Sequence, residues 1–260
     1  MNDFSNQSVI VTGGTKGVGF GIAQAFLQAG ANVFICGRNA PEQLPQGNGK
    51  QAVFIAADVR KPEESQQLID TVLAKTGRLD VVINNAGGSP PVKAADAPAK
   101  LTESIIRLNL IGPLVFSQQA FHALRKNAGG GSIVNIASIS GVRPSPGTAA
   151  YGAAKAGLIN VTRSLAQEWA ADKVRVNAII AGMIKTEASE DHYGGTNGIA
   201  LIEKSLPMGR MAVPSDIANA CLFLAAPQSA YISGAALDVP GAGEPPMFLK
   251  LAEEAFALSQ

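Results

Sequence analysis

Cysteine and histidine are scarce in this chain of 260 residues, which has two of each. Cys36 and Cys221 stand far apart, and neither belongs to a CxxC motif. Structural zinc sites need closely spaced cysteine and histidine ligands. The sequence therefore predicts no metal site. Because free thiols are typical of a reducing compartment, it also predicts a cytoplasmic protein.

The chain also lacks an excess of positive or negative charge. Lysine and arginine number 21 against 20 aspartates and glutamates, the formal net charge is +1, and no basic run stands out. Nucleic acids and anionic membranes attract basic patches, so we expect neither as a partner. No apolar run reaches the ~18 residues that a membrane span needs. The first residues, MNDFSNQ, lack the basic and apolar regions of a signal peptide.

Apolar residues, by contrast, make up 47% of the chain and occur in short runs that alternate with helical patterns. Runs typical of strands are SVIVTGG, ANVFICG, QAVFIAAD, LDVVINNAG, GSIVNIAS, VRVNAIIAG and AALDVPG. Strands alternating with helices predict a parallel sheet, and continuously apolar strands indicate helices on both of its faces. We predict one α/β domain over residues 1–260, a Rossmann-type doubly wound parallel sheet of about seven strands.

A glycine-rich turn follows the first predicted strand and opens a helix. It reads Thr12-Gly13-Gly14-Thr15-Lys16-Gly17-Val18-Gly19. Glycines in such a turn let a pyrophosphate approach the backbone, and the free N–H groups of the helix end attract the anion. A merely tight turn is the alternative. The strand before it and the helix after it favour dinucleotide binding.

The end of the second predicted strand indicates which dinucleotide binds. A carboxylate there would bond the ribose hydroxyls and repel a 2′-phosphate. This chain has Cys36-Gly37-Arg38-Asn39 instead. Arg38, assisted by Lys16, can pair with that phosphate, although both are also compatible with ordinary solvated positions. The sequence favours NADP(H) over NAD(H). Asp58 either bonds the adenine amino group or simply ends the third strand.

Tyr151 and Lys155 stand four residues apart in a predicted helix, on one of its faces. A phenol titrates near pH ~10, and a nearby ammonium stabilises the phenolate. We therefore expect a lowered pKa for Tyr151. A phenol tuned in this way can exchange a proton with a substrate oxygen near neutral pH. The pair alone is also compatible with chance spacing.

These motifs together resemble the short-chain dehydrogenase/reductase family, in its single-domain branch, over roughly residues 7–243. The turn matches T-G-x-x-x-G-x-G, and the tyrosine–lysine pair matches Y-x-x-x-K. Further matches follow in the family's order, namely Asn84-Asn85-Ala86-Gly87, Asn109 with Gly112, Ser138, Asn177, Gly182 and Thr186. Two departures are Ala181, where the family has proline, and Asp238-Val239-Pro240, where it has Asp-Gly-Gly.

The resemblance implies an oxidoreductase that transfers a hydride between NADP(H) and a carbonyl or secondary alcohol, with Tyr151 as general acid and base. Lys155 would lower the tyrosine pKa and bond the nicotinamide ribose. Ser138 would hold the substrate oxygen, and Asn109 would support a proton-relay water. The expected cofactor-binding residues are Gly13, Thr15, Lys16, Gly17, Val18, Gly19, Arg38, Asp58, Asn85, Ala86, Gly87, Tyr151, Lys155, Gly182, Ile184 and Thr186.

Residues 183–210 form a long connection outside the strand–helix alternation, and we expect them to be a substrate lid loop. Apolar residues expected to line the substrate pocket are Met183, Ile184, Tyr193, Ile199, Leu201, Ile202, Leu206 and Met208, with Ile139, Val142, Pro144 and Pro146 on the other wall. This lining favours a mainly apolar ketone or secondary alcohol of moderate size as the substrate.

The helix predicted at residues 102–126 and the helix of Tyr151 carry more apolar residues than one sheet face can cover. The surplus faces either loops of the same chain or a symmetry mate. The family resemblance favours the mate, as a homodimer or homotetramer. We expect the C-terminal tail, residues 244–260, to pack at such an interface.

Other functions stay open. Within the enzyme class, the substrate is either a 3-oxoacyl thioester or a steroid, sugar or xenobiotic ketone. A non-catalytic NADP(H)-binding regulatory protein is the alternative from another class. Such a protein would be expected to lose the catalytic tyrosine or lysine, and this chain keeps both. The glycine spacing and the lack of a large C-terminal substrate domain argue against an epimerase or dehydratase.

Overall fold

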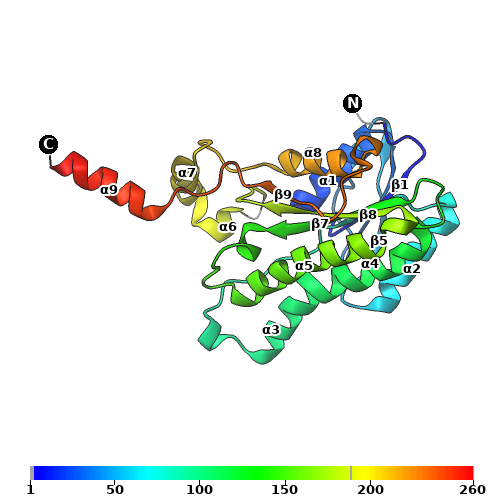
Figure 1. Cartoon of the computed structure of the whole chain (residues 1–260), viewed down its shortest axis with the longest axis horizontal. Coiled ribbons are helices and arrows are strands. Elements are labelled where there is room, and N and C mark those ends of the chain that lie inside the picture. Colours follow the sequence, from blue (N-terminus) through cyan, green and yellow to red (C-terminus); the bar gives the residue numbers. More distant parts are fainter. Residues whose placement is uncertain (1–2, 188, 260) are drawn as a thin grey trace.

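A parallel sheet of seven strands lies at the centre of the computed structural model, which describes residues 3–187 and 189–259 (Figure 1). The strands are β1 (Ser8–Thr12), β2 (Asn32–Gly37), β5 (Val53–Ala56), β6 (Val81–Asn84), β7 (Gly131–Ser138), β8 (Val174–Ala181) and β9 (Ala236–Val239). They lie in the order β5-β2-β1-β6-β7-β8-β9, and every neighbouring pair is parallel. The predicted doubly wound Rossmann-type sheet is confirmed. A separate small hairpin joins β3 (Gln46–Gly47) and β4 (Lys50–Gln51).

Helices cover both faces of the sheet (Figure 1). The α-helices of the described residues are α1 (Gly17–Gln28), α2 (Pro62–Thr76), α3 (Ala99–Ile106), α4 (Gly112–Leu124), α5 (Ala149–Glu168), α6 (Ser189–Tyr193), α7 (Gly195–Ser205), α8 (Pro214–Ala225) and α9 (Met247–Leu258), not all of which touch the sheet. α1 packs against α8 on one face, and α2, α4 and α5 lie on the other.

Each strand contributes side chains to both layers of the core, because successive residues point to opposite faces. In β1, Val9 and Val11 belong to the cluster that contains Phe26 of α1. Ile10 belongs to the other cluster, with Phe116 of α4. All five residues of β1 are buried. Continuously apolar strands follow from this two-sided burial.

The helix predicted at residues 102–126 is interrupted by a π-helical turn at Arg107–Ile111. Pro113 gives the physical reason. Proline has no N–H for the carbonyl four residues earlier, that of Asn109, and its ring crowds that carbonyl. The helix therefore holds one extra residue in this turn, and π-helical turns of this kind are frequent at functional sites. Asn109 is fully buried there.

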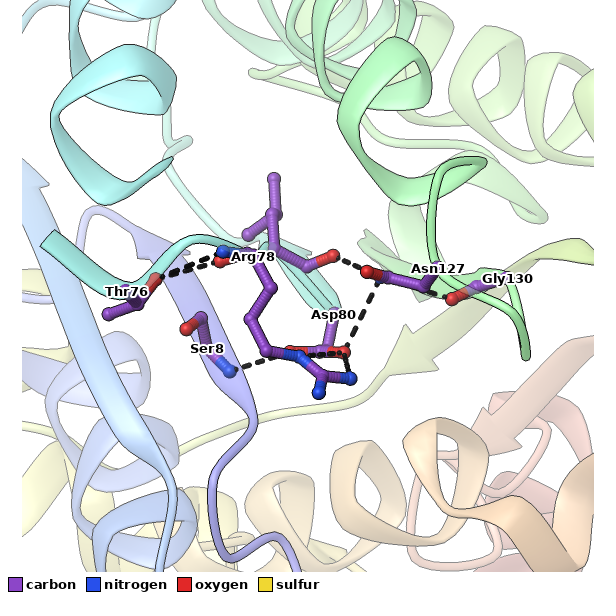
Figure 2. A network of polar contacts seen from close by, with 7 residues as sticks. Ser8, Thr76, Arg78, Asp80, Asn127 and Gly130 are labelled. Carbon is purple, nitrogen blue, oxygen red and sulfur yellow. Dashed lines mark hydrogen bonds and ion pairs between the residues drawn. The ribbon is translucent and has the colours of Figure 1, made fainter. Parts of the chain in front are cut away.

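A polar clasp ties the strands together at the amino-terminal edge of the sheet (Figure 2). The carboxylate of Asp80, which is 7% exposed, accepts the N–H of Ser8 at 2.8 Å. The Arg78 guanidinium donates to both oxygens of Asp80, with Nη2 2.6 Å from Oδ1. Asn127 Nδ2 donates to the Leu79 carbonyl at 2.6 Å. The clasp joins β1, the start of β6 and the chain before β7, on the edge opposite the glycine turn.

Two regions outside the sheet differ from a plain loop and tail. The predicted lid loop 183–210 contains α6 and α7, and residues 244–260 contain α9. α9 extends away from the sheet and its covering helices (Figure 1). Its large apolar side chains are exposed, namely Met247, Phe248, Leu249, Leu251, Phe256 and Leu258. Among the described residues, no helix has the length and apolarity to cross a membrane.

Candidate active site

A cavity of about 1450 Å³ opens at the carboxyl ends of the strands. The strand order reverses between β1 and β6, so the chain leaves these two strands in opposite directions and opens a crevice between them. Every residue predicted to bind the cofactor lines this one cavity, and so do Ser138, Tyr151 and Lys155. The fold thus brings the predicted binding and catalytic residues together, with Asn109 behind the cavity wall.

The glycine turn after β1 is fastened to the segment after β6. Thr12 Oγ1 accepts the N–H groups of Asn85 and Ala86, each at 3.0 Å, and Asn85 Nδ2 donates to the Thr12 carbonyl at 2.9 Å. Gly13 has a φ of +64°, and a Cβ there would stand 2.9 Å from the Ala86 Cα. Only glycine fits this close approach. The Asn85 side chain therefore shapes the cavity wall through the backbone.

Three cations, Lys16, Arg38 and Arg60, and the carboxylate of Asp58 line the part of the cavity beside β2 and β5. Arg38 and Lys16 are exposed there, and neither belongs to an ion pair within the described chain. Asp58 is held by Arg60, whose Nε lies 2.9 Å from Asp58 Oδ1. Hydrogen bonding from Arg60 lowers the pKa of Asp58, with smaller help from the charge of Arg38. This end of the cavity is suited to an anionic group beside a polar ring.

The catalytic candidates meet where β7 ends against α5. Ser138 is the last residue of β7, and its Oγ accepts the Ser140 N–H at 3.1 Å. Ser138 also hydrogen-bonds the Tyr151 side chain, which by itself lowers the pKa of Tyr151. Ala181, which replaces the family's proline, ends β8 in register with Ser138 and Val239. The strand edge behind the reacting groups is therefore regular despite that departure.

Lys155 lies deeper than Tyr151 on the same face of α5. It is 3% exposed, and its Nζ donates to the Ile136 carbonyl at 2.7 Å. Nζ stands 5.5 Å from the centroid of the Tyr151 ring, over its face. Burial lowers the pKa of Lys155 to about 8. The predicted helical neighbours are thus in contact, but as a cation over a ring.

The predicted lowering of the Tyr151 pKa is wrong for this structure. Burial raises the pKa of Tyr151, the Ser138 hydrogen bond lowers it, and the nearby Tyr193 raises it further. Burial dominates because removing a phenolate from water costs more than one hydrogen bond returns. Spacing along the helix correctly places the ammonium near the phenol, but it carries no information about how dry the site is.

Asn109 holds the segment after β6 through its side chain. Its Oδ1 accepts the Gly88 N–H at 2.9 Å, and its Nδ2 donates to the carbonyls of Gly88 and Ile105, also at 2.9 Å. Both amide hydrogens are therefore used by the backbone. The side chain stabilises the wall beside Lys155, and the predicted link to a relay water stays a prediction.

The lid has a small hydrophobic core of its own. Ile199 and Leu206 are buried with Met211, and Met183, Tyr193 and Ile202 pack against them. The prediction that Ile199 and Leu206 line the substrate pocket is therefore wrong, because α7 is amphipathic and turns these residues inward. Leu201 is 71% exposed and Met208 59% exposed. Tyr193 raises the pKa of Tyr151, so its phenol lies near that of Tyr151.

Comparison with known proteins gives the family. A family model described as enoyl-(acyl carrier protein) reductase matches residues 13–241. A curated relative, the 3-oxoacyl-(acyl-carrier-protein) reductase FabG of Chlamydia muridarum, is 38% identical over 91% of this chain and 96% of that protein. The chain belongs to the short-chain dehydrogenase/reductase family. It is an oxidoreductase of that family, which uses a nicotinamide cofactor.

Other members of the family are similar over nearly their whole length. The L-fucose dehydrogenase of Bos taurus is 33% identical, covering 93% of this chain and 90% of that protein. A crystal structure of a proposed short-chain alcohol dehydrogenase from Sinorhizobium meliloti 1021 matches with a TM-score of 0.83 at 32% identity, covering 92% of this chain and 96% of that one. The chain is similar to relatives with several different substrates.

The residues present fit a nicotinamide dinucleotide of the kind this family uses. The turn after β1 leaves no room for a Cβ at Gly19, where one would stand 2.3 Å from the Gly13 carbonyl oxygen. Exposed backbone N–H groups at the start of α1 suit a pyrophosphate. Arg38, Thr186 and Tyr151 all line this one cavity. A long, two-ended anionic cofactor matches this lining.

Several cavity residues are not predicted by the sequence motifs, and two of them are charged residues that form hydrogen bonds at the site. Glu187 and Arg60 both line the cavity. Arg60 lies two residues after Asp58, so a strand-ending aspartate followed by a cation is a signal that could have identified it. Glu187 comes directly after Thr186 but contacts Gly17, far away in the sequence. No local pattern indicates that contact.

Proposed function

We propose that this protein is an NADP(H)-dependent oxidoreductase that interconverts a carbonyl and a secondary alcohol. One observation carries the proposal: Ser138, Tyr151 and Lys155 line the same cavity as the glycine turn after β1. Placing a proton donor beside a dinucleotide site is the arrangement that carbonyl reduction needs. A non-catalytic binding protein would not require this convergence.

The chain's residues divide the work of proton transfer. The bound cofactor supplies or accepts the hydride. Ser138, which already hydrogen-bonds Tyr151, holds the substrate oxygen beside the phenol. Tyr151 gives its proton to that oxygen during reduction and takes one during oxidation. A raised pKa keeps the phenol protonated and ready to donate, and it makes the oxidative direction depend on higher pH.

Lys155 supports the proton donor from beneath. Its Nζ is fixed by the Ile136 carbonyl and faces the Tyr151 ring. As the phenolate forms, an ammonium at this place stabilises the new negative charge. Because burial sets the pKa of Lys155 at about 8, the ammonium form predominates at neutral pH. Lys155 therefore brings a positive charge to the phenol at the pH where the enzyme would work.

The preference for NADP(H) rests on Arg38 and Lys16. Both are exposed cations at the end of the cavity where the chain has no ribose-binding carboxylate after β2. Arg38→Ala should weaken NADPH binding by about tenfold and leave NADH binding nearly unchanged, since only NADPH carries the 2′-phosphate. Fluorescence titration with both cofactors measures this. Equal losses for the two cofactors would contradict the assignment of Arg38.

The catalytic assignment is tested with Tyr151→Phe. The variant loses the transferable proton but keeps the ring, so kcat should fall by about 10³-fold or more while NADPH affinity stays within a factor of about two. NADPH oxidation followed by absorbance over a panel of ketones provides the measurement. Retention of wild-type kcat would refute the role of Tyr151.

A 3-oxoacyl thioester is the second candidate substrate. It is favoured by the similarity to a relative whose name states that reaction. The panel should therefore include a 3-oxoacyl thioester beside steroid, sugar and aromatic ketones. The substrate with the highest kcat/KM decides between the two readings, and turnover of none of them would contradict both.

We also propose that the chain assembles as a homodimer or homotetramer through α9. A helix of 12 residues is marginal by itself in water, and this one exposes six large apolar side chains. Burying them against a second copy would supply the missing packing. Light scattering on a chain truncated after Gly243 checks this. If the truncated chain keeps the number of subunits of the full chain, α9 is not the assembling element.

A further inference from the structure

Glu187 occupies a position in the cofactor site that favours an anion. Its Oε1 accepts the backbone N–H of Gly17 at 2.8 Å, across 170 residues of sequence. Gly17 is the first residue of α1. Its N–H therefore has no partner within the helix, and it lies at the positive end of the helix dipole. The carboxylate thus satisfies one of the exposed donors that make this turn attractive to anions.

The hydrogen bond to the first N–H of α1, and not an ion pair, holds the Glu187 carboxylate in this position. Among the ion pairs of the described residues, none joins Glu187 to the neighbouring Lys16 or to Arg38. Gly17 has a φ of +55°, a conformation that favours glycine, and a Cβ there would lie 3.5 Å from Thr186 Cγ2. The glycine turn and the segment after β8 are therefore in close approach at this point.

A dinucleotide pyrophosphate would use these same N–H groups. Two anions cannot share one donor at hydrogen-bond distance, because their charges repel each other. We propose that Glu187 is an internal competitor for the pyrophosphate: it holds the Gly17 N–H in the cofactor-free protein and gives it up when the dinucleotide binds. This inference rests on the proposed dinucleotide function and concerns the same cavity.

The competitor is also joined to the lid. The Thr186 N–H donates to Ser189 Oγ at 2.8 Å, and Ser189, buried at 3% exposure, is the first residue of α6. On the other side, Lys185 N–H donates to the Ala212 carbonyl at 2.8 Å and fixes the chain before Thr186. Glu187 thus lies between the fixed start of the lid and α6. Release of its carboxylate changes the restraint at the first turn of the lid.

The test compares Glu187→Ala and Glu187→Gln with Glu190→Gln. Glu190 is an exposed carboxylate three residues along the lid, so its variant makes the same change of charge away from Gly17. Removing the competitor should tighten NADPH binding by about two- to fivefold, the size expected for an exposed ionic contact. The gain should shrink at high salt. Glu190→Gln should change affinity by less than half as much.

Hydrogen exchange gives a second readout that does not depend on activity. In the cofactor-free protein, Glu187→Ala should speed amide exchange in the lid, and Glu190→Gln should leave it at the wild-type rate. With NADPH bound, wild type and Glu187→Ala should exchange alike, because the carboxylate is then released in both. Unchanged or weaker NADPH binding in both Glu187 variants, or wild-type exchange in the cofactor-free Glu187→Ala lid, overturns the inference. Failure of the wild type to bind either dinucleotide contradicts the proposed function itself.

Discussion

Replacing Lys155 with methionine should make the folded protein more stable at neutral pH while removing its activity. Burial lowers the pKa of Lys155 from 10.5 to about 8. That difference of about 2.5, at ~1.4 kcal/mol per pH unit, means that the charged lysine costs the native state about 3 kcal/mol. Methionine fills a similar volume without charge. It gives up the 2.7 Å hydrogen bond to the Ile136 carbonyl, worth about 1 kcal/mol. The net gain in the free energy of unfolding is about 2 kcal/mol.

The sign of the pH dependence follows from proton binding. Between pH 8 and 10.5 the unfolded chain keeps the Lys155 proton and the native state releases it, so wild-type stability gains from rising pH in this window. Urea unfolding of wild type and Lys155→Met at pH 7, 8.5 and 10 measures the gap. We expect about 2 kcal/mol at pH 7, which corresponds to about 4–8 °C in Tm, and almost none by pH ~10.

Lys75→Met is the matched control, because Lys75 is an exposed lysine near the end of α2. Its stability should follow that of wild type at every pH. A gap between wild type and Lys155→Met that does not change with pH would refute the reasoning. A less stable Lys155→Met at pH 7 would also refute it, since the cost of the buried charge would then be smaller than the lost hydrogen bond.

Two further changes test the two edges of the sheet. Asp80→Ala removes the acceptor of the Ser8 N–H and of the Arg78 guanidinium, so denaturant unfolding should show a loss of about 2–4 kcal/mol. NADPH affinity should stay at the wild-type value, and a large change would mean that the clasp reaches the site. Gly19→Ala places a Cβ 2.3 Å from the Gly13 carbonyl oxygen, and calorimetry should show NADPH binding weakened at least ~10-fold. Gly129→Ala, whose Cβ would meet nothing within 4 Å, should bind normally, and equal effects would contradict the steric argument.

The sheet and the glycine turn are predictable from the sequence because their signals are local. All five residues of β1 are buried, so a continuous apolar run is enough to identify the strand. The glycine turn follows directly, and the fold places its neighbours from β6 and β8 at the same edge. Strand order then brings Ser138 and Tyr151 together without any pairwise information.

Contacts between distant parts of the chain are not predictable in this way. The bond from Gly17 to Glu187 and the bond from Ser8 to Asp80 join residues 170 and 72 positions apart. The burial of Tyr151 depends on how the whole site packs. The spacing of Tyr151 and Lys155 along the helix therefore could not predict that the pKa of Tyr151 is raised. The same holds for Ile199, whose burial depends on how α7 packs.

Ile199, Leu206 and Met211 form a hydrophobic cluster separate from the clusters around the sheet, so the predicted lid has packing of its own. Its amino-terminal end leaves β8 beside the reacting groups, and its carboxyl-terminal end enters α8, which packs on α1. A segment with its own hydrophobic cluster can be exchanged between related enzymes of the family without changing the core around the sheet. We expect substrate preference in this chain to change when residues 183–211 are transplanted, with Ser138 of β7 and Tyr151 and Lys155 of α5, the proposed catalytic residues, left untouched.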